Sequence, residues 1–119
     1  MKHAYLAIIF VCLLISCGLQ ANERVISTLN KVDLIAVDKE NQEGHNYGTD
    51  YYAFNHNEFS VQVTIQLSHS VNTQDGLLTG VVLIKPNERS QLGWLIQNNM
   101  TFESKWNVQW QVTKAQETP

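Results

Sequence analysis

The stretch FSVQVTIQLS, residues 59–68, alternates apolar and polar side chains over ten residues without an exception. In a β-strand successive side chains point to opposite faces, so the five apolar residues would share one face and the Ser, Gln and Thr residues the other. A helix would spread the same apolar residues around its circumference. The stretch therefore predicts a half-buried strand of an antiparallel sheet.

The same pattern returns near the end of the chain, and weaker versions of it lie between. Trp106, Val108, Trp110 and Val112 alternate with Asn, Gln and Thr residues. Packing the apolar faces of six or seven short strands against each other predicts an all-β, immunoglobulin-like antiparallel sandwich, with a small barrel as the alternative. The weaker strands are expected at residues 32–37, 49–54, 77–84 and 91–97.

The first 21 residues have a different pattern. Met1–His3 is a short basic start, and residues 4–15 are twelve positions without a charge. This run is shorter than the roughly 20 apolar residues that span a membrane, so we interpret residues 1–21 as a cleaved signal peptide. A buried N-terminal helix is the less favoured alternative, because the run has no solvent-facing side. We therefore predict an exported, periplasmic protein.

Two cleavage positions fit this leader. Leu14-Ile15-Ser16-Cys17 resembles the lipobox of bacterial lipoproteins, and cleavage before Cys17 would leave a lipid on that residue and a membrane tether. Cleavage after Ala21 would instead release a soluble chain. Both cysteines lie in the leader, so the domain after it has no disulfide. The expected parts after the leader are a tether at 22–30, the sandwich at 31–114 and a tail at 115–119.

Without a disulfide, the sandwich depends on buried apolar side chains. Each large one contributes about 1.5–3 kcal/mol when it leaves water, which offsets the ordering of the chain. The predicted core residues are Phe59, Val63, Ile65, Leu83, Ile96, Trp106 and Trp110.

Charge and motif content exclude several function classes. The chain has 8 basic and 11 acidic residues and a net charge of -3, and the basic residues are scattered, which argues against nucleic acid as a partner. Neither a Gly-x-Ser-x-Gly elbow nor a phosphate-binding glycine loop occurs. His69 and its neighbouring serines would point to opposite faces of a strand. We therefore expect no enzymatic activity and no cofactor.

Metal binding has few candidate ligands after the leader. His45, His56 and Glu58 are the candidates for a small periplasmic metal carrier, which we keep as an alternative function. Zinc sites usually take three or four ligands at compact spacing. These residues lie instead in turns between strands, so we expect solvated turn residues and no metal site.

Aromatic residues offer the better candidates for binding. Tyr47, Tyr51 and Tyr52 lie in or beside the polar segment around Gly44–Gly48, and tyrosines are common in recognition surfaces. Packing in the core or at an edge is the competing interpretation, and it is favoured for Tyr52. The sequence thus predicts a protein–protein interaction or accessory module, with a carbohydrate- or peptidoglycan-binding module as the alternative. Three tryptophans suggest the alternative, although Trp106 and Trp110 share the apolar face of their strand.

Several segments follow one another along the chain in an order that is similar to that of a known family. These are Tyr52-Ala53-Phe54-Asn55, the strand from Phe59, Ser70-Val71-Asn72, the turn at 85–88 and the late aromatic strand. In this order they resemble the β-sandwich region before the catalytic domain of some bacterial lysostaphin-like zinc peptidases. Those peptidases hold zinc partly through a His-x-His pair, which the 119 residues lack. The resemblance implies a non-catalytic accessory domain of the bacterial envelope whose partner is an envelope protein or a cell-wall component.

Overall fold

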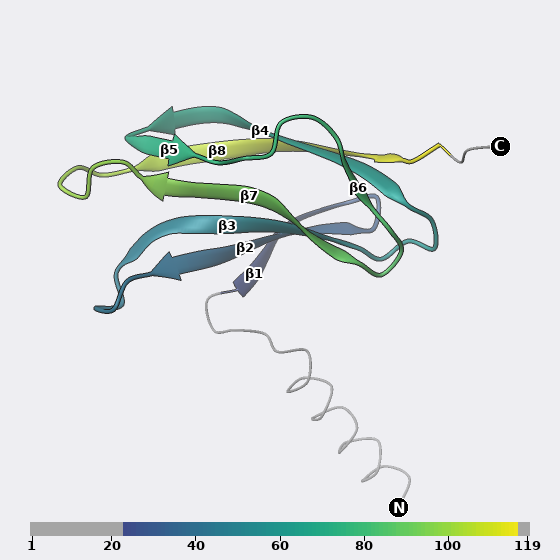
Figure 1. Ribbon diagram of the computed structural model, residues 1–119, viewed down its shortest axis with the longest axis horizontal. Helices are drawn as coiled ribbons and strands as arrows, with labels where there is room; N and C mark the ends of the chain where they lie inside the picture. The colour runs from purple at the N-terminus through teal and green to yellow at the C-terminus, as the bar shows by residue number, and fades with distance from the viewer. Residues whose placement is uncertain (1–22, 117–119) are drawn as a thin grey trace, which may run out of the picture.

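The computed structural model describes residues 23–116, which form eight β-strands in two antiparallel sheets. Sheet A has the order β1-β2-β3-β7-β5 and sheet B the order β6-β4-β8. Figure 1 shows the two layers, with β4 and β8 above β3, β2 and β1. Residues 23–116 include no helix long and apolar enough to cross a membrane. The strands are β1 (Glu23–Leu29), β2 (Val32–Glu40), β3 (Asn46–Asn55), β4 (Val61–Val71), β5 (Thr73–Asp75), β6 (Val82–Ile84), β7 (Arg89–Gln97) and β8 (Lys105–Lys114).

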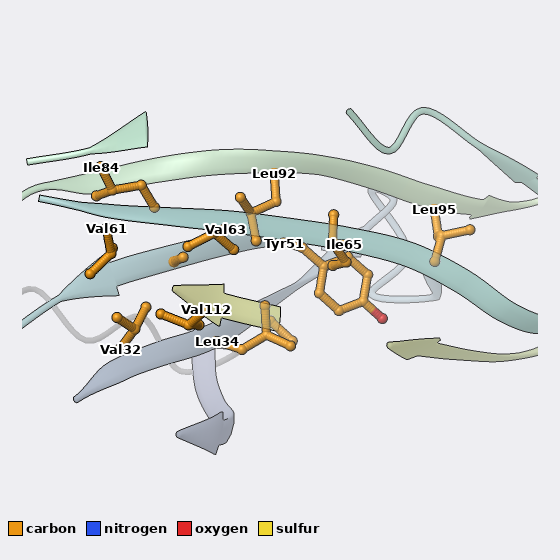
Figure 2. Packing of buried hydrophobic residues seen from close by; sticks show 12 residues of the cluster. Val32, Leu34, Tyr51, Val61, Val63, Ile65, Ile84, Leu92, Leu95 and Val112 are labelled. Carbon is orange, nitrogen blue, oxygen red and sulfur yellow. The ribbon is translucent and has the colours of Figure 1, made fainter. Parts of the chain in front are cut away.

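The expected all-β class with two antiparallel sheets is confirmed, and the alternating stretch explains why. From Val61 onward it forms β4, whose Val61, Val63 and Ile65 are at most 6% exposed, while Gln62 and Gln66, which alternate with them, are exposed. These side chains pack with Leu34 and other residues of sheet A in one cluster (Figure 2). Trp106 and Trp110 are partly buried against the same cluster.

Residues 23–29, which the sequence assigned to a tether, form strand β1 of sheet A. A two-residue turn joins β1 to β2: Asn30 and Lys31 have φ values of 50° and 60°, the left-handed pair that a type I′ hairpin requires. The Asn30 side chain donates from Nδ2 to the Val112 carbonyl of β8 at 3.0 Å. The turn thus connects the two sheets.

Two predicted core residues are exposed, and that part of the prediction is wrong. Leu83 pairs with Gln62 across β6 and β4, which places it on the outer face of sheet B, and it is 58% exposed. Phe59 precedes β4, is 36% exposed and has the Lys114 ammonium 4.6 Å from its ring centroid. The strand expected at 77–84 is limited to β6, because the chain crosses between the sheets before Val82.

A buried asparagine holds the end of β3 in place. Asn55 is fully buried, and its Nδ2 donates to the carbonyls of Phe59 (2.8 Å) and Ile84 (3.1 Å). Its Oδ1 accepts from the backbone N–H and the side chain of Asn57, both at 2.9 Å. One side chain therefore connects the end of β3, the chain leading into β4, and β6.

Candidate functional site

The three candidate tyrosines all lie on β3, but the strand does not bring them together. Tyr51 faces the core and is 4% exposed. Tyr52, the next residue, faces the outer side of sheet A, where the Arg89 guanidinium lies 4.3 Å from its ring centroid. Tyr47 is half-buried near the start of the strand and lines neither hollow described below. The alternation of β3 therefore places Tyr52 on the face opposite Tyr51.

Tyr51 lies at the floor of a cleft between the two sheets, which we call the end cleft. It has a volume of about 510 Å³ and is lined by residues of β1, β2, β3, β4 and β8. The Trp106 indole Nε1–H donates to the Tyr51 hydroxyl at 2.9 Å. In Figure 2 the hydroxyl oxygen points away from Leu34, Val63 and Val112. The floor of the end cleft is therefore an aromatic pair, and its polar group is the Tyr51 hydroxyl.

Burial sets the protonation of Tyr51. It raises the pKa of the hydroxyl above its ordinary value of 10.0, and the carboxylate of Asp38 acts in the same direction. The hydrogen bond from Trp106 and the charge of Arg24 partly oppose the shift. The hydroxyl is therefore protonated at neutral pH, and it presents a neutral polar group to the cleft.

The charged side chains that line the end cleft carry a positive excess. Arg24 and Asp38 form an ion pair at 2.7 Å across β1 and β2. Lys105 and His69 also line the cleft. Within residues 23–116, Lys105 has no ion-pair partner. The Asp38 carboxylate is thus balanced by Arg24, and Lys105 gives the described lining of the end cleft a net positive charge.

The wall of the cleft at the start of β8 is positioned by Asn72, a corner residue with φ of 56° between β4 and β5. Its Nδ2 donates to the carbonyls of Asn99 (2.8 Å) and Phe102 (2.9 Å). The Ser104 hydroxyl donates to the Asn72 carbonyl at 2.7 Å. The sequence pattern predicted only a strand end at Asn72. Asparagine is common at left-handed turn positions, and this preference is the signal that could have identified the corner.

A second feature is the incomplete covering of β4. On one side β8 pairs with it from Val61 to Val71. On the other side β6 pairs only with Val61–Val63. No other described strand lies beside the remainder of that side. We call the stretch from Thr64 to Val71 on this side the open edge.

Backbone groups point out of the open edge at regular positions. Residues of an antiparallel strand direct their N–H and C=O groups alternately to the two sides. The Val112 carbonyl, opposite Val63, accepts from Asn30 and so points away from β4. Val63 therefore points its own groups away from β8, and Ile65 and Leu67 do the same by alternation.

A groove of about 890 Å³ lies over β4 and β8 and reaches the start of the open edge. It is bounded by Thr64–Gln66 of β4, Gln109–Gln111 of β8 and, in the loop before β6, Thr79 and Gly80. Gly80, two residues before β6, has a positive φ of 89°. Residues with a side chain rarely adopt this backbone conformation. This turn keeps the loop from continuing along β4.

The candidate metal ligands are not brought together. Among residues 23–116, no group of three or more His, Cys, Asp or Glu side chains could hold a metal ion. His56 instead pairs through Nε2 with Asp33 at 2.7 Å. The lipidation candidate Cys17 and the predicted signal peptide lie outside the described residues.

Comparisons with protein-family models, curated proteins and solved structures found no match.

Proposed function

We propose that this chain is a non-enzymatic, exported domain of the bacterial envelope, an immunoglobulin-like sandwich that binds a protein partner by adding one of the partner's strands to the open edge of β4. The observation that carries the proposal is that no strand within residues 23–116 pairs with the outward backbone groups of Ile65 and Leu67. An extended polypeptide is the natural complement of such a row, because it supplies N–H and C=O groups at the same spacing.

The composition of the open edge supports this proposal. Exposed edges are commonly protected by proline, by lysine or by other charged side chains. Residues 64–68, TIQLS, contain neither proline nor a charged residue. One bulge, between Leu67 and His69, is the only irregularity of the β4–β8 pairing. The edge is thus suited to pairing over the length from Thr64 to Leu67.

The groove supports it independently. Strand addition needs room for a fourth strand of sheet B and for its side chains. The groove is bounded by Thr64–Gln66, by Thr79 and Gly80 and by Gln109–Gln111 of β8, so it can seat side chains of an added strand. Each backbone hydrogen bond gained contributes about 0.5–1.5 kcal/mol, so affinity would come from several bonds and from side chains seated in the groove.

The test compares two substitutions at one edge position. Leu67→Pro removes an N–H that points out of the sheet. Leu67→Val keeps that N–H, and its side chain is close in volume to that of proline. Affinity capture from envelope extract is run with wild type and both variants, with identification by mass spectrometry. A partner captured by wild type and Leu67→Val, and lost with Leu67→Pro, supports the proposal. A partner that Leu67→Pro retains, or no specific partner at all, contradicts it.

A second candidate, binding of carbohydrate or peptidoglycan, is favoured by the outer face of sheet B. Gln62, Thr64 and Gln66 of β4 lie opposite Thr113, Gln111 and Gln109 of β8. The Gln66 side chain donates from Nε2 to Oε1 of Gln109 at 3.2 Å. Such an uncharged row of amides and hydroxyls matches the hydroxyls of a neutral glycan. Co-sedimentation with purified peptidoglycan, reduced by Gln66→Ala together with Gln109→Ala, would support this candidate, and no co-sedimentation would remove it.

A further inference from the structure

We propose that the end cleft is a binding site for a carboxylate, held by Lys105 and Arg24 above the Tyr51–Trp106 pair. This site goes beyond the strand-addition proposal, because the end cleft and the groove share no lining residue. Its volume of about 510 Å³ is within the usual range for small-ligand sites and exceeds what a bare carboxylate fills. The ligand is therefore a carboxylate attached to a larger group.

The charge balance of the cleft selects an anion. Among residues 23–116, Asp38 is the only acidic residue in the lining, and Arg24 pairs with it at 2.7 Å. Lys105 contributes a cation without an acidic partner among residues 23–116. An anionic ligand would neutralise the positive charge of Lys105, and its affinity would fall with rising salt concentration.

The polar lining selects a group that accepts hydrogen bonds. The Arg24 guanidinium and the Lys105 ammonium are donors without acceptor capacity, and the Asn107 side-chain amide adds donors at the same wall. The Tyr51 hydroxyl remains protonated beside them. A carboxylate accepts up to four hydrogen bonds through two oxygens, so it uses such a set better than a hydroxyl does.

The floor selects what carries the carboxylate. Trp106 is half-buried and Tyr51 is buried, and the indole of Trp106 is fixed by its hydrogen bond to the Tyr51 hydroxyl. A fixed aromatic surface next to a cation accommodates a compact apolar or sugar-ring body next to an acid group. Two sources present this combination: the C-terminus of a peptide with small side chains, and an acidic amino sugar.

The test follows the Trp106 indole N–H signal of ¹⁵N-labelled protein, because that group lies at the floor of the end cleft. Two matched pairs of probes are titrated at low salt. The peptide pair is acetyl-Ala-Ala with a free C-terminus and the same peptide as its C-terminal amide. The sugar pair is N-acetylmuramic acid and its neutral primary amide. Each pair changes one carboxylate, so whichever acid binds identifies the source.

The expected result is a saturable shift of the Trp106 signal with at least one acid and none with its neutral counterpart. Lys105→Gln should weaken that binding by about tenfold. Lys114→Gln, at the other end of the same strand, should leave it unchanged. Leu67→Pro should also retain it, so that this proposal and the strand-addition proposal fail separately.

Three results would overturn the carboxylate site. Neither acid producing a saturable shift up to about 10 mM would do so, because a weaker constant corresponds to less than about 3 kcal/mol of binding free energy. Equal binding of an acid and its neutral counterpart would show that the carboxylate is not recognised. Equal loss in Lys105→Gln and Lys114→Gln would show that net charge acts and not the cleft.

Discussion

The indole of Trp106 on β8 donates to the hydroxyl of Tyr51 on β3 at 2.9 Å, and this contact joins the two sheets at the floor of the end cleft. Each partner needs the other, since a polar atom without a hydrogen bond at this depth would cost about 1–3 kcal/mol. The same contact orients the start of β8 relative to the core.

Tyr51→Phe should change how stability depends on pH. Burial raises the pKa of the folded-state hydroxyl above 10.0, so folding favours the protonated form. That contribution is complete below the unfolded-state pKa and is lost as pH rises through the higher folded-state pKa. The free energy of unfolding, measured by urea denaturation from about pH 9 to 11, should fall more steeply in wild type than in Tyr51→Phe. Parallel curves for the two proteins would contradict this account of Tyr51.

Asn55→Ala should be among the most destabilising substitutions in the chain. It leaves the carbonyls of Phe59 and Ile84 and the N–H groups of Asn57 without their partner inside the fold. We expect a loss of about 2–4 kcal/mol in the free energy of unfolding. Asn98→Ala is the control, since the Asn98 side chain is exposed and makes no hydrogen bond within residues 23–116. Similar losses in the two variants would show that the buried network is not a stabilising feature.

Gly93→Ala should loosen the loop that precedes β6. A Cβ on Gly93 would lie 2.5 Å from the Gly76 carbonyl oxygen and 2.5 Å from the Leu77 Cα, and its φ of 129° is unfavourable for alanine. Because those atoms are backbone, the loop has to move, and we expect a loss of about 2–4 kcal/mol. Gly44→Ala, where φ is 78° but nothing lies within 4 Å, isolates the strain at about 1 kcal/mol. Thermal denaturation giving equal losses would show that the loop does not pack against Gly93.

Proline substitutions along β4 should distinguish its two sides. Leu67→Pro removes an N–H that points out of the sheet, so its cost should stay near the packing loss of about 1–2 kcal/mol. Gln66→Pro removes a group directed at Gln109 of β8 and should cost about 3 kcal/mol or more. Circular dichroism melts of both variants give the comparison. A larger loss for Leu67→Pro would mean that the open edge is paired within the fold.

Local alternation was sufficient to predict the two-layer β-architecture. Residues 59–68 and 106–113 carry a period of two, and the structure places Val63 and Ile65 in the core with Trp106 packed against it. The same rule failed at Leu83 and Phe59, because alternation indicates which residues share a face but not which face is covered. Leu83 continues the outer face of sheet B, and Phe59 lies beyond the end of β4.

The candidate sites depended on long-range pairing that the sequence does not display. Tyr51 was singled out, but its partner Trp106 lies 55 positions later, and no local pattern joins them. The open edge exists because β6 has three residues against eleven in β4, and its length depends on where the chain crosses between sheets. Asn30 and Lys31 likewise give no apolar pattern, so the strand before their turn was interpreted as a tether.

Backbone amide hydrogen exchange, measured by NMR on the isolated domain, tests the open edge most directly. The amides of Thr64 and Gln66 face β8 and should exchange slowly, whereas those of Ile65 and Leu67 face outward and should exchange faster by about tenfold or more. A partner that adds a strand should then slow the exchange of Ile65 and Leu67 alone. Equal protection of all four amides in the isolated domain would show that the edge is already covered, and the proposed function would be contradicted.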